Sequence, residues 1–90
     1  MFIPDVEVVF VEHISNSGEN RDFHSVKFLD RGLVLRKFNF VGNVDDFENL
    51  KQNDRCIADI KLRFGREKES YVLKSADIIS IKKLDYYGRK

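Results

Sequence analysis

The sequence predicts an all-β fold, a five-stranded antiparallel barrel with one short helix between the third and fourth strands. The dominant pattern is an alternation of apolar and polar residues over short segments rich in β-branched and aromatic side chains. A five-stranded sheet with one apolar face and little helix to cover it must close on itself. We therefore expect residues 1–84 to form a single barrel domain and residues 85–90 to be a mobile basic tail.

Three strands joined by short connections are expected first, over residues 6–13, 23–30 and 33–41. The first strand, VEVVFVEH, ends at the turn-rich stretch ISNSGENRD. In the second, FHSVKFLD, Val26 and Phe28 point to one face and Lys27 to the other. An Arg-Gly turn at residues 31–32 leads into the third strand. Consecutive strands with such connections indicate an antiparallel meander.

Residues 42–54, GNVDDFENLKQND, break the alternation and predict one or two helical turns, capped by Asp45 with Glu48 as its capping-box partner. A fourth strand is expected over residues 55–64 and a fifth from residue 71. The last apolar piece, ADIISIKKL, either extends the fifth strand or forms a sixth. The fourth strand alternates most regularly, with Cys56, Ala58, Ile60, Leu62 and Phe64 on one face and Arg55, Asp59, Lys61 and Arg63 on the other.

This order of elements resembles the OB-fold, a small barrel that binds oligonucleotides and oligosaccharides on the face of its second and third strands. The stretch FENLKQNDRCIADIKL is similar to an OB pattern in which an apolar residue precedes a turn ending in Asp and an alternating fourth strand. ISNSGENRD and GREKES stand where that fold has two loops flanking a bound strand. The chain also resembles the small single-stranded-DNA-binding proteins of phages and mobile elements. The resemblance implies sequence-tolerant binding of single-stranded DNA in replication or recombination, with RNA or an oligosaccharide as alternative ligands.

Two interpretations of the third strand, LVLRKFNF at residues 33–40, stay open. In one, its leucines point into the barrel while Arg36 and Phe38 point out, where bases stack on aromatic rings and cations follow phosphates. In the other, a bulge between Arg36 and Lys37 resets the register, and Phe38 and Phe40 join the leucines in the core.

The expected nucleic-acid contact is a basic track with an aromatic ring in it. The net charge is only +1, but residues 21–41 and 55–74 are basic while residues 1–20 and 42–54 are acidic. If the basic strands share one face, that face has a positive potential. The alternative is that these charges are simply solvated. The predicted nucleic-acid-binding residues are Lys27, Arg36, Lys37, Phe38, Lys61, Arg63 and Tyr71.

The sequence contains no catalytic or metal-binding signature. His13 and His24 are not at metal-ligand spacing, and Cys56 is distant from both. His24, near basic residues, would either contact a phosphate or, as is more common at a strand end, be solvated. A single cysteine excludes an intramolecular disulfide and favours a reducing compartment. The longest apolar run, VVFV, is far shorter than a membrane span. We therefore expect a cytoplasmic binding protein that is not an enzyme, with no cofactor, no metal and no membrane partner.

The competing function is that of a protein-interaction or assembly module. Val9 and Val11 would form an exposed apolar strip, because the alternate residues already fill the core. The edge of an incompletely closed barrel would also accept a partner strand. An exposed patch of these valines with Ile79 and Ile81 would favour protein association, whereas aromatic rings beside the basic track would favour nucleic acid. A homodimer is compatible with either function.

Overall fold

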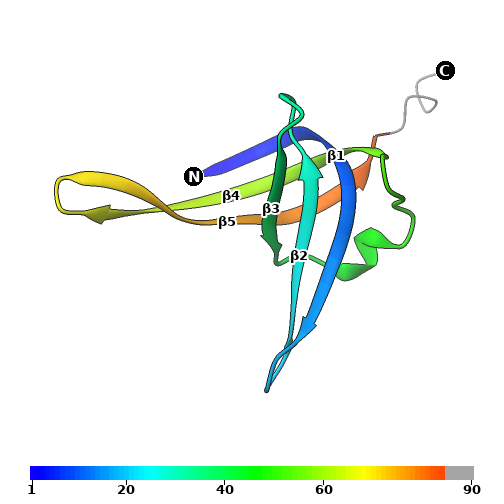
Figure 1. Cartoon of the computed structure of the whole chain (residues 1–90), viewed down its shortest axis with the longest axis horizontal. Helices are drawn as coiled ribbons and strands as arrows, with labels where there is room; N and C mark the ends of the chain where they lie inside the picture. Colours follow the sequence, from blue (N-terminus) through cyan, green and yellow to red (C-terminus); the bar gives the residue numbers. More distant parts are fainter. Residues whose placement is uncertain (85–90) are drawn as a thin grey trace.

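The computed structural model describes residues 1–84 as five strands and one short 3₁₀ helix (Figure 1). The predicted tail, residues 85–90, lies outside the described residues. No helix in the described part is long and apolar enough to cross a membrane. In chain order the elements are β1 (Phe2–Ser17), β2 (Asp22–Leu29), β3 (Leu35–Phe40), η1 (Val44–Phe47), β4 (Arg55–Glu67) and β5 (Ser70–Lys83).

The strands close into a barrel in the order β1-β2-β3-β5-β4, as predicted, so the open edge that the competing function would use is not found in it. Neighbouring strands are antiparallel except β3 and β5, which run parallel through the pairs Asn39–Asp77 and Phe40–Ile78. The prediction of a wholly antiparallel barrel is therefore wrong at this contact. The reason is geometric, because a closed ring of five strands cannot alternate direction all the way round.

The core fills the barrel with alternate residues from all five strands. Phe47 of η1 closes one end, with its ring centroid 6.0 Å from that of Phe10 and 4.6 Å from that of Phe40. Burial raises the pKa of the Cys56 thiol to about 11, so this thiol is protonated at neutral pH. The buried residues of the core are Val8, Phe10, Val26, Phe28, Phe40, Cys56, Ala58, Ile60, Ile78 and Ile81.

β1 begins earlier than the sequence predicts. Pro4 lies within it, where the pairing with β4 is irregular between Ile3 and Val6. Asp5 has a φ of 55° at this point, and its amide donates to Asp59 Oδ1 at 3.0 Å. An irregular site tolerates the missing N–H of proline. Simple alternation does not reveal such a site.

The short helix is a single 3₁₀ turn, and its cap is Asn43 instead of the predicted Asp45. The Asn43 side chain accepts a hydrogen bond from the Asp45 amide at 2.9 Å. Asp46 accepts from the Ile81 amide at 3.3 Å, which ties the helix to β5. Asn and Asp are equally good N-caps, and GNVDD contains both within three residues. The sequence alone therefore does not determine which of them caps the helix, and tertiary contacts decide.

Two hairpins project from the barrel in different directions (Figure 1). β4 continues past Phe64 to Glu67, and β5 is one continuous strand, so no sixth strand forms. The pairing of β4 with β5 shifts between Asp59 and Ile60 and again after Arg63. Phe64 consequently lies beyond the barrel with 45% of its surface exposed, and its predicted place in the core is wrong. The second projecting hairpin joins β1 to β2.

Candidate nucleic-acid interface

The basic residues of β2, β3 and β4 share the outer face of the barrel. Lys27 pairs directly with Lys37 across β2 and β3. Two residues further along β3, Asn39 pairs with Asp77 of β5, which in turn pairs with Lys61 of β4. Paired residues, and residues two apart on one strand, point to the same side of a sheet. These five side chains therefore lie together on the outside of the barrel.

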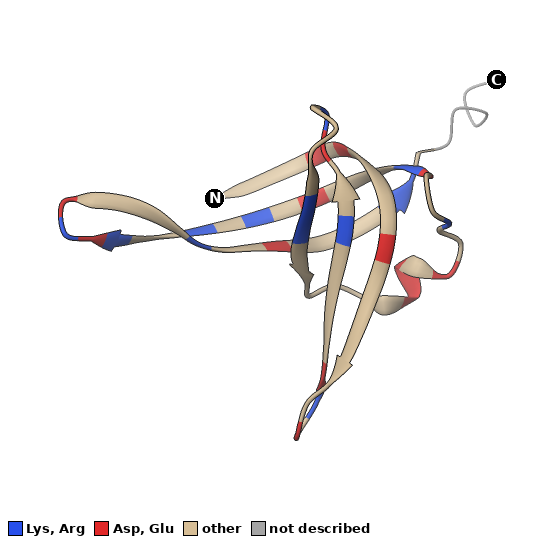
Figure 2. Ribbon diagram, in the orientation of Figure 1, with Lys and Arg blue, Asp and Glu red and all other residues tan. Residues whose placement is uncertain are grey.

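Arg63 extends the same side of β4, because it lies two residues after Lys61. We call the set Lys27, Lys37, Lys61 and Arg63 the basic face. Its members are exposed except Lys27, which is half-buried, and within residues 1–84 none of them forms an ion pair. Figure 2 shows the basic positions of β2 and β3 side by side and further ones along β4. The face is not uniformly positive, since it also holds Asp77 and borders Glu12, the cross-strand partner of Lys27.

An exposed aromatic ring lies on the same side of β2 as the basic face. Phe23 precedes Lys27 by four residues and shares its side of the strand. Its surface is 51% exposed, and the guanidinium carbon of Arg21 lies 5.0 Å from its ring centroid. A groove of about 480 Å³ lies beside it, lined by residues that include Phe23, Asn39 and Asp77. The groove thus runs from the Phe23 ring and the Arg21 side chain on β2 and its hairpin to two polar side chains, Asn39 of β3 and Asp77 of β5.

The third strand agrees with the interpretations of LVLRKFNF only in part, because Phe38 and Phe40 lie on the core side, as the second one predicts, but no bulge is present and the leucines are exposed. Its register with β2 runs without a bulge from the pair Leu29–Leu35 to the pair His24–Phe40. Phe40 is buried, and Phe38 packs against the core with its ring edge-on to Phe28, at a centroid distance of 5.0 Å. Phe38 therefore faces inward, on the opposite side of β3 from the basic face.

Leu33 and Leu35, which both interpretations place in the core, are 74% and 56% exposed. Leu35 shares the outer side of β3 with Lys37. Alternation separates a strand into two sets of side chains, but it does not say which set faces inward when both contain apolar and charged members.

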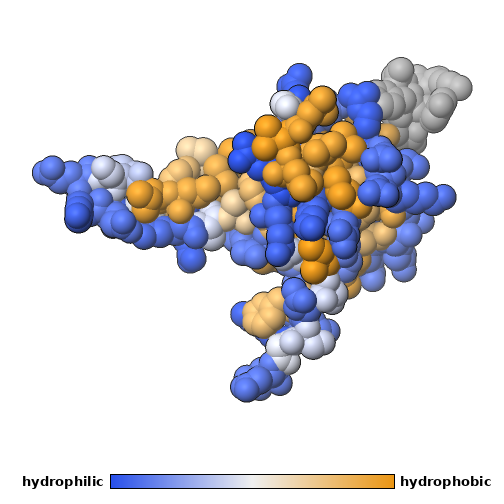
Figure 3. All heavy atoms as spheres, in the orientation of Figure 1, coloured by the Kyte–Doolittle hydropathy of each residue, from blue (hydrophilic) through white to orange (hydrophobic). Residues whose placement is uncertain are grey.

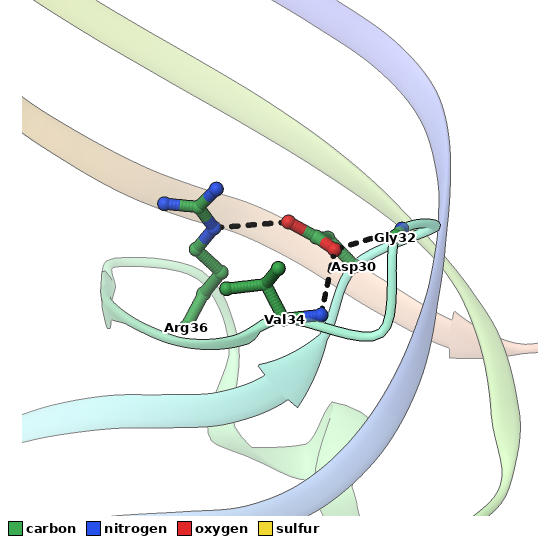
Figure 4. A network of polar contacts seen from close by, with 4 residues as sticks. All are labelled: Asp30, Gly32, Val34 and Arg36. Carbon is green, nitrogen blue, oxygen red and sulfur yellow. Dashed lines mark hydrogen bonds and ion pairs between the residues drawn. The ribbon is translucent and has the colours of Figure 1, made fainter.

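Arg36 is the second residue of β3, and its side chain pairs with the turn between β2 and β3 instead of joining the basic face. Asp30 organises this turn, because its Oδ1 accepts hydrogen bonds from the amides of Gly32 (2.9 Å) and Val34 (3.0 Å) (Figure 4). Its Oδ2 pairs with Arg36 Nε at 3.0 Å. The Val34 amide, followed by the Arg36 side chain, holds the pKa of Asp30 below its usual value. Arg36 also lies on the opposite side of β3 from its neighbour Lys37.

Tyr71 lies on the β4–β5 hairpin and is 75% exposed. It pairs with Arg66, whose guanidinium carbon is 6.0 Å from the tyrosine ring centroid. Arg66 shares a side of the hairpin with Phe64, which is opposite to that of Arg63. The register therefore does not bring Tyr71 to the basic face. The β4–β5 hairpin thus carries an aromatic ring beside a cation, Tyr71 beside Arg66. The β1–β2 hairpin carries the same kind of pair, Phe23 beside Arg21.

Phe23 and Arg21 are not among the residues predicted to bind nucleic acid, although the stretch ISNSGENRD, which contains Arg21, is predicted to flank the bound strand. The sequence does contain a signal for Phe23. Like Lys27, it occupies a position of β2 on the side opposite to the core residues Val26 and Phe28. The place of Arg21 depends on the conformation of the hairpin loop, where the Gly18 amide donates to the Arg21 carbonyl at 2.8 Å. No periodic pattern predicts that contact.

The two histidines meet at the end of the barrel that Phe47 closes. His13 Nε2 and His24 Nδ1 are hydrogen-bonded at 3.0 Å, and the His13 ring stacks on Phe47 with a centroid distance of 4.0 Å. Burial, together with the neighbouring His24, lowers the pKa of His13. The expectation that His24 is solvated is wrong, since it is half-buried in this pair. Within the described residues, no three His, Cys, Asp or Glu side chains gather in a way that would hold a metal ion.

No protein-family model matches the chain, and no curated protein matches it in sequence. Its structure is similar to the crystal structure of a small single-stranded DNA-binding protein from Streptomyces coelicolor. The similarity covers 100% of this chain and 97% of that chain, with a TM-score of 0.51 and 16% sequence identity. At this identity the likeness concerns the fold. The chain is thus a closed OB-type barrel that resembles the fold of a single-stranded-DNA-binding protein, as the order of its predicted strands implies.

Proposed function

We propose that this protein binds single-stranded DNA, with little sequence preference, on the outer face of β2, β3, β5 and β4. The observation that carries the proposal is the strand register, which gathers the basic face on one side of the sheet with the exposed ring of Phe23 on the same side. The fold similarity to a single-stranded DNA-binding protein supports the same ligand. We also propose that the protein is not an enzyme, needs no cofactor and acts in the cytoplasm.

The chemistry of this surface suits a flexible polyanion. Lysine and arginine side chains that are free of ion pairs contact phosphates and release counterions. The Phe23 ring offers a stacking surface for any base, because every base has a π-face. Asn39, between them, carries a side-chain amide that can donate to a base or a sugar. RNA offers the same phosphates and rings, so it is a second ligand to be compared in each titration.

Phe23 and Phe64 form a matched pair for a test by substitution. Both are exposed phenylalanines of a projecting hairpin, at 51% and 45%, but only Phe23 shares the side of the basic face. Because stacking on one base contributes about 1–3 kcal/mol, Phe23→Ala is expected to weaken the affinity for a labelled oligo-dT roughly 5- to 150-fold. Phe64→Ala is expected to leave it close to the wild-type value.

Fluorescence anisotropy at low salt measures both affinities, and circular dichroism checks that each variant folds. Equal losses in the two variants would mean that any exposed aromatic ring on the molecule contributes. No loss with Phe23→Ala would remove the proposed stacking site from the β2 side of the groove.

A further inference from the structure

A carboxylate lies within the surface that we propose for single-stranded DNA. Asp77 of β5 is half-buried and stands between Asn39 of β3 and Lys61 of β4 in one row across the strands. Among residues 1–84 it forms no ion pair, and its one side-chain hydrogen bond comes from Asn39 Nδ2 to its Oδ1, at 3.4 Å. A carboxylate repels phosphates, so it weakens a contact made with the backbone of a polyanion alone. The position of Asp77 therefore favours a ligand that also offers hydrogen-bond donors.

The groove of about 480 Å³ connects Asp77 and Asn39 to the exposed ring of Phe23. Its exposed apolar lining comes from Phe23 and Val41, which are 51% and 63% exposed. Figure 3 shows an apolar area on the projecting β1–β2 hairpin with hydrophilic surface around it. Arg21 lies beside the Phe23 ring and also lines the groove. One recess, of a volume typical for small-molecule sites, thus holds a stacking surface, a cation and an amide beside a carboxylate.

The apolar strip that the sequence predicts for protein association does not offer a comparable site. Of that strip, Val9, Val11 and Ile79 are half-buried and Ile81 is buried in the core. The groove beside Phe23 is where an exposed ring and polar groups meet on the outer surface.

The Watson–Crick edges of the four bases differ in the donors that they offer to a carboxylate. Guanine carries two adjacent donors, the N1–H and the N2 amino group, and its O6 acceptor follows the N1–H. A carboxylate accepts from both donors at once, in a charge-assisted bidentate contact. Adenine and cytosine offer one amino group each, and thymine offers one ring N–H. Bases of single strands are recognised on these edges, which pairing leaves free.

We propose that the groove is a guanine site, in which Asp77 accepts from the N1–H and the N2 amino group, Asn39 donates to O6 and Phe23 stacks on the ring. The order of acceptor, acceptor and donor along Asp77 and Asn39 is complementary to the edge of guanine. The hydrogen bond between these two side chains leaves them available, because the amide nitrogen has a second N–H and the carboxylate has further acceptor sites. Arg21 would then contact a phosphate of the stacked nucleotide.

This inference rests on the proposed binding of single-stranded DNA and adds a preference at one base of the bound strand. The other nucleotides contact the basic face through their phosphates, whatever their sequence. The two proposals fail in different ways. Equal affinity for all sequences removes the guanine site and leaves the binding of single strands in place, whereas no binding of any single strand removes both.

Oligonucleotides that differ in one base test the site. Each is a labelled oligo-dT of about eight nucleotides, because one OB-fold covers about 4–16 nucleotides. The central base is either guanine or hypoxanthine, the base of deoxyinosine, which keeps the N1–H and O6 of guanine but lacks its amino group. The two purines stack alike, so a difference in affinity reports the amino group. Fluorescence anisotropy at low salt is expected to give a dissociation constant about fivefold or more lower for the guanine oligonucleotide.

Asp77→Asn and Asp22→Asn form the matched pair of variants, and circular dichroism checks that each folds. Both remove a carboxylate from the lining of the groove, but Asp22 is next to Phe23 on β2, so its side chain points to the opposite side of the strand. Asp77→Asn is expected to bind the two oligonucleotides within about twofold of each other. It is also expected to bind plain oligo-dT more tightly than wild type does, because it removes a negative charge from beside the phosphates. Asp22→Asn is expected to keep the preference for guanine.

Equal affinities of the wild-type protein for the two oligonucleotides would overturn the guanine site. A preference that survives Asp77→Asn would also overturn it, and so would one that Asp22→Asn removes.

Discussion

At the scale of single residues, the pair of His13 and His24 makes the stability of the barrel depend on pH. The rings share one hydrogen bond, in which one nitrogen donates and the other accepts, and the His13 ring lies flat on Phe47. Two protonated rings cannot share that bond, because all of their ring nitrogens are donors. Burial adds to the cost of charging His13 and lowers its pKa.

The pair predicts a loss of stability on mild acidification. The pKa of His13 is lower in the folded chain than the 6.5 of an unperturbed histidine, so the unfolded chain binds more protons as the pH falls through this range. The stabilisation is complete above pH 6.5 and is lost below it. We expect the free energy of unfolding, measured in urea, to be smaller at about pH 5.5 than at about pH 7.5. His13→Gln should reduce that difference.

Two aspartates with altered pKa values do not obscure this measurement. Hydrogen bonds lower the pKa values of Asp30 and Asp59 below 3.8, so their stabilisation is lost only in more acidic solution. An equal loss of stability in wild type and His13→Gln would assign the effect to other groups.

At the scale of elements, the closure of the barrel depends on a short parallel contact between β3 and β5. Only two residue pairs join these strands, and the chain leaves β3 through Gly42. A Cβ atom at Gly42 would lie 1.9 Å from the carbonyl oxygen of Ile79, which is a backbone atom of β5. Only glycine allows the two backbones to approach this closely. The Val41 amide donates to the Ile78 carbonyl at 3.0 Å in the same place.

Gly42→Ala should therefore destabilise the barrel, by about 1–3 kcal/mol or more, because overpacking forces the strands apart. Gly32→Ala is the matched control, since its added Cβ atom would meet only Asp30 Oδ1, at 3.4 Å. We expect that control to change the free energy of unfolding by about 0.5 kcal/mol or less. Urea denaturation of both variants measures the difference. Similar values for the two would show that the contact between β3 and β5 does not need glycine.

At the scale of the whole molecule, the alternation and the single helical break predict the number and order of the elements. The parallel contact follows from closing an odd number of strands. The inward side of β3 does not follow, because each side of LVLRKFNF mixes apolar and charged residues. Its pairing with β2 decides it, by placing Phe38 opposite the buried Val26. The length of the β4–β5 hairpin also escapes prediction, since GREKES reads as a turn although most of it is paired strand.

The site is predictable where alternation is regular and unpredictable where it stops. Lys27, Lys61 and Arg63 alternate with core residues on their strands, and the structure places all three on the outer side of the barrel, whereas their contact with nucleic acid stays a prediction. Tyr71 follows a shift in register after Arg63 and lies on the other side of its hairpin. Such a shift leaves no mark in the apolar pattern, so counting along the strand fails beyond it.

The most direct measurement is the affinity for a labelled oligo-dT, titrated by fluorescence anisotropy at several salt concentrations beside a duplex of equal length. The proposal predicts tighter binding to the single strand than to the duplex. The logarithm of the affinity should fall with the logarithm of the salt concentration, with a slope of about −3 if all four residues of the basic face contact phosphates. No binding to the single strand at low salt, or equal affinity for the duplex, would contradict the assignment of this face to single-stranded DNA.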